Sequence, residues 1–302
     1  MSLRCLTHAA FVAAVAAVGC SPAHAPASGA FVRDDFGDSV RVGPAVRIVS
    51  LNPVVTEFLF AAGAGPRVVG RTHWDHYPTA ADAVPDLGDG IGPNVEAVLG
   101  ARPDLVLLYA CPSNRRAATG LQQAGVRTLT VRTDHIADLR RLADIFAAVT
   151  GDSAGNAVVD TVLASVDAVR RLPRPAHPVR AFWLMFDDAP RVYALGHGSF
   201  VHELLELAGA ANAFDDVAAP SAQVSIEEVI RRNPDVIVAS PVSARRLRQS
   251  ATWNAVPAVR AGRIVVSDSA LVGRPGMRLG EAARHVRRLL VADSVPQTAA
   301  RR

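Results

Sequence analysis

Lysine is absent from this chain, so all 32 of its basic side chains are arginines. This bias, beside abundant alanine, is typical of a GC-rich coding sequence, and the net charge of +4 is therefore weak evidence for a nucleic-acid partner. No basic run interleaved with aromatic residues occurs, although nucleic-acid-binding proteins usually show one. Charged residues are also few, at 20% against 50% apolar, which excludes wholesale disorder and predicts a packed core.

Cysteine is scarce as well, with only three in 302 residues. Cys5 lies in an expected leader segment and Cys20 at the end of that segment, which leaves Cys111 alone in the mature chain. No intrachain disulfide can then form. Because Cys111 stands alone just after an expected strand, we interpret it as structural and not as a nucleophile.

Apolar runs of membrane-spanning length are missing too. The longest early run, residues 8–18, has eleven residues, which is too short to cross a bilayer but suits a signal peptide whose positive start is Arg4. We therefore expect a signal peptide over residues 1–20.

Two cleavage sites compete in this leader. Ala23-His24-Ala25 fits the small-x-small rule, but Pro26 would follow the cut. Ala17-Val18-Gly19-Cys20 resembles a bacterial lipoprotein signal, in which Cys20 is lipidated and becomes the mature N-terminus. We favour lipidation over plain secretion, and residues 21–45 are then a tether and N-terminal extension.

Strands and helices alternate along the rest of the chain, which predicts parallel βα units. Asp104 to Leu108 is a fully apolar strand of the kind buried on both faces of a parallel sheet. Asp152 to Leu172 is expected to form one long helix of about 21 residues, near 30 Å in length.

An internal repeat is the most informative feature. Residues 95–106 (VEAV…PDLV) recur as 226–237 (IEEV…PDVI), and residues 56–64 (TEFL…AGA) recur as 202–210 (HELL…AGA). A third echo pairs Ala124-Gly125 with Ala261-Gly262. The economical explanation is two similar α/β lobes, one on each side of the long helix. The expected divisions are a signal peptide at 1–20, an extension at 21–45, an N-terminal lobe at 46–150, a linking helix at 151–173, a C-terminal lobe at 174–293 and a loose tail at 294–302.

The sequence contains no recognisable catalytic motif. Gly63-Ala64-Gly65 follows an expected helix, whereas a dinucleotide loop follows a strand. The segment 196–199 (GHGS) is not the Gly-x-Ser-x-Gly elbow, and no metal-ligand spacing occurs. We expect no enzyme, with a secreted hydrolase as the alternative class.

One loop concentrates the groups that suit a ligand. Residues 71–78 (RTHWDHYP) follow a strand end, where α/β sheets place their ligand crevice, and they hold two aromatics in a chain with 5%. A flat ligand could stack on these rings; the alternative is a partly buried loop cluster. We expect His73 and His76 to line a pocket without direct metal ligation. Including comparable segments of the second half, the predicted ligand contacts are Arg71, His73, Trp74, His76, Tyr77, Gly196, His197, Ser199, Arg274 and Arg278.

Glu96 and Glu227 are important because they are repeated. Each begins a short helix, where a carboxylate gains from the positive end of the helix dipole. In a two-lobed fold they would also present one acid per lobe to a symmetric membrane partner with two basic sockets.

Residues from about 47 to 291 resemble the periplasmic substrate-binding proteins that serve ABC importers for cobalamin, ferric siderophores and haem. The opening 47–63 (RIVSLNPVVTEFLFAAG), the loop 74–78 (WDHYP) and the segment 94–104 carry the resemblance, with 223–229 (QVSIEEV) and 274–281 (RPGMRLGE) later. The resemblance implies two Rossmann-like lobes with parallel sheets, a rigid linking helix, and a ligand between the lobes. It also implies that Glu96 and Glu227 bind arginines on the permease.

The resulting expectation is a binding protein for a metal chelate, either cobalamin (or another corrinoid) or a ferric siderophore. It would deliver this ligand to an ABC permease dimer with its ATPase. The alternatives are a haem-binding protein of the same family and a non-transport sensor or adaptor. We expect a monomer without an intrinsic cofactor, in the periplasm or at the outer cell surface and anchored by lipid.

Overall fold

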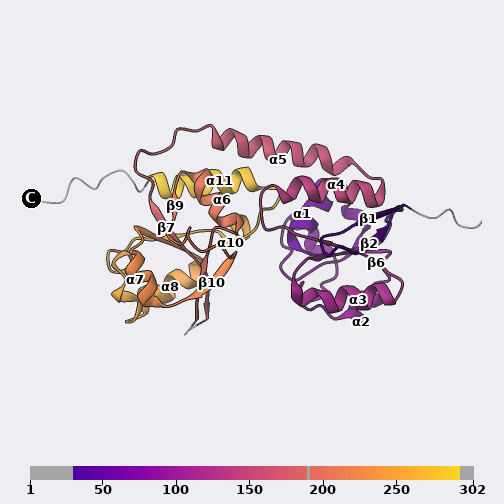
Figure 1. The fold of residues 1–302 in the computed structure, drawn as a ribbon, viewed down its shortest axis with the longest axis horizontal. Coiled ribbons are helices and arrows are strands. Elements are labelled where there is room, and N and C mark those ends of the chain that lie inside the picture. Colours follow the sequence, from indigo (N-terminus) through magenta and orange to yellow (C-terminus); the bar gives the residue numbers. More distant parts are fainter. Residues whose placement is uncertain (1–29, 189–190, 293–302) are drawn as a thin grey trace, which may run out of the picture. The chain divides into compact units, whose positions relative to one another are not determined.

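Two larger β-sheets, one in each half of the chain, organise the computed structural model, which describes residues 30–188 and 191–292 (Figure 1). The described residues from Phe31 onward belong to one compact unit. The expected signal segment with Cys20 and the tail 294–302 lie outside the described residues. In the described part of the chain, no helix has both the length and the apolar character needed to cross a membrane.

The first sheet is entirely parallel, in the order β4-β3-β5-β6. Its central strand β5 alternates between two hydrophobic clusters: Leu105 and Leu107 pack with Phe58 and Phe146, whereas Val106 and Leu108 pack on the other face. Both faces are therefore covered by helices, as the apolar sequence of this strand predicts. The strands are β3 (Ile48–Leu51), β4 (Val68–Gly70), β5 (Leu105–Tyr109) and β6 (Arg127–Val131).

Helices of the first half begin and end at residues suited to those positions. Asn52 caps α1 by accepting the Val54 amide at 3.0 Å, and Pro53 occupies the first helical position. The helices are α1 (Pro53–Ala61), α2 (Val95–Gly100), α3 (Arg115–Gln123) and α4 (Asp138–Thr150), with 3-10 turns at Gly65–Arg67, Thr79–Ala83 and Pro112–Asn114.

The second sheet is parallel where β9, β7, β11 and β12 pair, but β8 and β10 extend it in the antiparallel sense. The sequence did not predict these two strands, because Ser221–Val224 is short and largely polar, without a clear apolar face. The strands are β7 (Arg180–Asp188), β8 (Arg191–Leu195), β9 (Ala211–Asn212), β10 (Ser221–Val224), β11 (Val236–Ala239) and β12 (Ile264–Val266).

Two helices of the second half begin after a serine cap: Ser199 caps α6 (Phe200–Ala208) and Ser225 caps α7 (Ile226–Arg232). The others are α8 (Pro241–Gln249), α9 (Pro257–Arg260), α10 (Ser269–Val272) and α11 (Leu279–Ala292), with a 3-10 turn at Trp253–Ala255.

The linking helix α5 (Ala154–Arg170) is shorter than the predicted range of 152–172. It begins later because the Asp152 carboxylate accepts the Ala154 amide at 3.1 Å and also pairs with Arg67. The helix contacts α1 and α4 of the first half and α6 and α11 of the second half (Figure 1). Its buried valines, at positions 159, 162, 166 and 169, belong to one hydrophobic cluster with side chains of both halves, so this helix packs against both.

The internal repeat is visible in the hydrogen bonds. Asn94 caps α2 by accepting the amide three residues on at 3.0 Å, and the equivalent Ser225 caps α7 in the same way at 3.2 Å. Each helix is followed by a non-glycine residue in the left-handed region, Arg102 at φ 48° and Asn233 at φ 45°. The second echo matches equally well, because Gly63 (φ 78°) ends α1 and Gly209 (φ 81°) ends α6. The two halves are thus equivalent in local detail.

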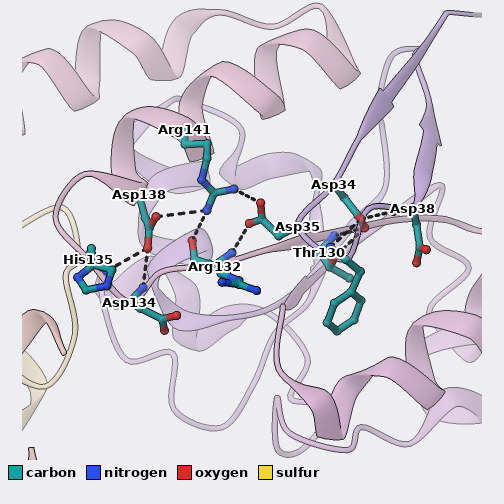
Figure 2. A network of polar contacts seen from close by, with 10 residues as sticks. Asp34, Asp35, Asp38, Thr130, Arg132, Asp134, His135, Asp138 and Arg141 are labelled. Carbon is teal, nitrogen blue, oxygen red and sulfur yellow. Dashed lines mark hydrogen bonds and ion pairs between the residues drawn. The ribbon is translucent and has the colours of Figure 1, made fainter. Parts of the chain in front are cut away.

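The segment before the first sheet is better ordered than the predicted extension. Strands β1 (Phe31–Arg33) and β2 (Ser39–Arg41) form a hairpin whose turn binds the edge strand β6. The Asp34 carboxylate accepts the amide and the hydroxyl of Thr130, and Arg141 pairs with both Asp35 and Asp138 (Figure 2). The sequence missed this hairpin because its anchors lie about a hundred residues further along the chain.

Candidate functional site

The aromatic loop, residues 71–78, follows β4 as predicted and presents its rings to solvent. Trp74 is 53% exposed and Tyr77 is 39% exposed. Beneath them, the Asp75 carboxylate is buried and accepts the Thr72 amide at 2.7 Å. The loop therefore offers flat apolar faces on a backbone that is fixed from below.

Arg71 holds this loop in place. Its side chain is 8% exposed, and its guanidinium donates to the carbonyls of Ala81 at 2.8 Å and Thr72 at 2.7 Å. These contacts give Arg71 a structural role in the loop, so we leave it out of the proposed ligand contacts.

Two arginines of the second half contact the aromatic loop of the first half. The terminal nitrogens of Arg274 both donate to the Trp74 carbonyl at 3.2 Å. The Arg278 guanidinium lies 3.8 Å from the centroid of the Tyr77 ring and donates to the Ala270 carbonyl at 2.9 Å. Two segments that the sequence predicted separately are thus brought together.

Two buried carboxyls lie behind these contacts. Glu57 of α1 is 3% exposed and accepts the Met277 amide at 2.9 Å. Burial raises the pKa of Glu57 above its usual value, and the Met277 amide together with Arg274 and Arg278 opposes the shift. Burial likewise raises the pKa of Asp75, against hydrogen bonds from Thr72. The site therefore combines exposed aromatic rings and two guanidiniums with two buried carboxyl groups.

The two histidines of the loop have different neighbours. The His73 ring lies 4.4 Å from that of Trp74, and His76 faces the Asp82 carboxylate at 3.3 Å. Within residues 30–188 and 191–292, no group of three or more His, Cys, Asp or Glu side chains is arranged to hold a metal ion.

The predicted segment at the start of α6 is mainly structural. Ser199 caps that helix and donates to the Gly196 carbonyl at 2.7 Å. A side chain at Gly196 would place its Cβ 2.2 Å from the Val217 carbonyl oxygen, so only glycine fits there. His197 differs because it is exposed, with its ring 4.5 Å from that of His202. It is the member of this group most able to meet a ligand.

Glu96 and Glu227 occupy the same place in the two halves. Each is the second residue of its helix, two positions after the cap, and each is exposed. A hydrogen bond within its own helix start and one from Ser225 lower the pKa of Glu227. The neighbouring Glu228 is instead engaged by Arg231 and Arg232.

Sequence reasoning missed Glu57 and Asp75 as members of the site. In the sequence, Glu57 stands out only as part of the internal repeat. The signal available for Glu57 was a charged residue in an otherwise apolar helix, since such a residue is rarely buried without a specific partner.

Matched halves that contact one helix, with aromatic and arginine side chains meeting from opposite halves, define a two-lobed substrate-binding protein. A family model described as "Periplasmic binding protein" matches residues 48–271, and the chain belongs to this family.

Relatives agree with this membership. The chain is 28% identical over 260 residues to the uncharacterized ABC transporter substrate-binding lipoprotein YvrC of Bacillus subtilis strain 168, covering 82% of this chain and 81% of YvrC. It is 30% identical over 213 residues to the vitamin B12-binding protein of Yersinia pestis strain Pestoides F, covering 69% and 74%. A solved structure, the periplasmic heme-binding protein BhuT in complex with two hemes, matches with a TM-score of 0.71 and 26% identity over 82% of this chain and 98% of BhuT.

These findings establish the class of function. The chain is an extracytoplasmic substrate-binding protein of the ABC-transport type, and its relatives are substrate-binding transport proteins rather than enzymes. Its general partners are a permease and an ATPase.

Proposed function

We propose that the chain captures a metal chelate, either a corrinoid such as cobalamin or a ferric siderophore, between its two halves. The observation that carries this proposal is the meeting of Trp74 and Tyr77 with Arg274 and Arg278. A large flat or conjugated ligand gains from exposed rings, and its anionic groups gain from guanidiniums. The remaining proposed contacts are His73, His76, His197 and, through the backbone, Gly196 and Ser199.

Fluorescence titration tests this proposal directly. Of the tryptophans, Trp74 is exposed whereas Trp183 and Trp253 are buried, so comparison with Trp74→Phe isolates the part of the emission change that comes from Trp74. We expect saturable quenching by cyanocobalamin or by a member of a ferric siderophore panel, and loss of most of the signal in Trp74→Phe. Absence of saturation with every chelate would reject the proposal.

Haem is the second candidate, favoured by the same arginines because its two propionates are anionic. A haemin titration followed by absorbance in the same buffer separates the two candidates. Tighter binding of haemin than of any corrinoid or siderophore would replace the first proposal by the second.

The exposed acids at the helix starts suit delivery to the importer. We propose that Glu96 and Glu227 dock onto arginines of a permease dimer, one acid for each subunit, and that the protein does so as a monomer. We also propose lobes at 46–150 and 174–293, the linking segment 151–173 between them, and lipidation at Cys20. Incorporation of labelled palmitate into the chain, and its loss in Cys20→Ser, would test the anchor.

A further inference from the structure

Glu57 and Glu203 are equivalent residues of the internal repeat, and each accepts a backbone amide from the opposite half. Glu57 of α1 accepts the Met277 amide at 2.9 Å. Glu203 of α6 accepts the Ile136 amide at 2.7 Å. The two contacts run in opposite directions between the halves.

The two amide donors are equivalent as well. Ile136 stands two residues before Asp138, the first residue of α4, and Met277 stands two residues before Leu279, the first residue of α11. The first helix of each half is therefore bonded to the segment that opens the last helix of the other half. Such a match of both donor and acceptor is not expected of incidental surface contacts.

The Glu57 contact is tightly enclosed. A Cβ at Gly276 would lie 2.2 Å from the Glu57 Oε2 atom, so any side chain at this position would displace the carboxylate from its present place. A hydrogen bond from an amide to a buried carboxylate is stronger than a neutral one, and breaking it leaves both groups desolvated. This contact is costly to lose.

The Glu203 contact meets a segment that is fixed locally. The Asp138 carboxylate accepts the amides of Asp134 at 2.8 Å and His135 at 3.0 Å (Figure 2). The second oxygen of Glu203 faces His135 Nδ1 at 3.2 Å. The amide of Ile136 is thus presented by a rigid turn.

Both contacts act beside the linking helix. The four helices that they involve, α1, α4, α6 and α11, all contact α5. One hydrogen bond between two bodies still permits rotation about it, whereas two at separate places restrict that rotation. The Glu57 contact also bears on the site, because Met277 lies between Arg274 and Arg278.

We propose that Glu57 and Glu203 are reciprocal positioning residues that fix the angle between the two halves and hold Arg274 and Arg278 against the aromatic loop. The part concerning ligand contacts rests on the proposed function, whereas the part concerning the angle does not.

Hydrogen exchange followed by mass spectrometry tests each contact in the ligand-free protein. Glu57→Ala should speed exchange in residues 274–278 about tenfold or more, and Glu203→Ala should do the same in residues 134–138, because a charge-assisted hydrogen bond is lost. Glu57→Gln and Glu203→Gln keep an acceptor oxygen and should restore most of the protection. Glu206→Ala, on α6 but directed at His202, is the matched control and should change neither segment. Unchanged exchange in both alanine variants would overturn the proposal.

The angle is measured by the distance between two spin labels, attached to unnatural amino acids at the exposed positions 116 and 249. We expect a narrow distance distribution in the wild type and in each single variant, and a clearly broader one in the double variant Glu57→Ala, Glu203→Ala. Gly276→Ala combined with Glu203→Ala provides a second route and should broaden it too. A double variant as narrow as the wild type would overturn the proposal. No chelate is present in either experiment, so a failure of the proposed ligand would leave these outcomes unaffected.

Discussion

The carbonyl of Trp74 accepts both terminal nitrogens of Arg274 at 3.2 Å, across 200 residues of sequence. This contact joins an exposed aromatic residue of one half to an arginine of the other. The position of the ring on which a ligand would stack therefore depends on how the two halves are placed. The predictions below test the residues on each side of it.

Trp74→Ala should weaken chelate binding by about 1–2 kcal/mol, because the ligand loses a stacking face. Trp74→Phe keeps an aromatic face and should lose less. Calorimetric titration of the three proteins with the same chelate measures the difference. Equal affinities in wild type and Trp74→Ala would place the ligand away from this loop.

Arg274→Ala should weaken binding roughly fivefold, equivalent to about 1 kcal/mol, because the loop loses two hydrogen bonds to its backbone. Arg274→Lys retains a cation with one donor pointing at the carbonyl and should restore part of the loss. The check is the dissociation constant of both variants beside the circular dichroism of each. Identical losses in Ala and Lys variants would show that the forked geometry, and not the charge alone, is required, whereas no loss in either would contradict the assignment.

Glu96→Ala with Glu227→Ala should abolish uptake while ligand affinity stays unchanged, because both residues are exposed at helix starts and neither is among the proposed ligand contacts. Uptake of labelled ligand by cells that carry the cognate importer measures the first part, and titration measures the second. The control is Glu206→Ala with Glu281→Ala, two exposed acids on other helices, which should transport normally. Normal uptake by the Glu96 and Glu227 double variant would contradict the docking role.

Asp75→Asn should remove part of the pH dependence of stability. Burial raises the pKa of Asp75 from its usual 3.8, so the folded state binds this proton more tightly than the unfolded state. The contribution to stability is therefore full below the ordinary carboxyl range and is lost as the pH rises through the raised pKa. Asparagine keeps an acceptor for the Thr72 amide without titrating.

Urea unfolding of wild type and Asp75→Asn between about pH 4 and pH 8 measures this difference. The advantage of the asparagine variant over the wild type should grow with pH across that interval. A constant difference at all pH values would show that Asp75 does not titrate in the interval. Burial also raises the pKa of Glu57, so this residue contributes pH dependence of the same sign in both proteins.

The sequence predicted the elements whose signals are local. The repeat of residues 95–106 at 226–237 predicted two equivalent halves, and both copies form a capped helix followed by a residue in the left-handed region. The first hairpin was missed because its anchors are distant in sequence, and β10 was missed because it is short and largely polar. A polar short strand carries little signal of its own.

The sequence predicted which residues lie together at the candidate site, but not what each side chain contacts there. Trp74, Tyr77, Arg274 and Arg278 were identified and do meet, because strand ends and glycine-rich turns mark the loops that bear function. The sequence predicts Arg71 as a ligand contact, whereas its guanidinium donates to the backbone carbonyls of Thr72 and Ala81. Side-chain direction decides such roles, and one sequence does not specify it.

The most direct test of ligand capture between the halves is hydrogen exchange of the protein with and without its chelate. Binding between the halves predicts added protection in residues 71–78 of the first half and in residues 274–278 of the second, in the same titration range as the Trp74 fluorescence change. Protection confined to one half, or located away from both segments, would contradict the account.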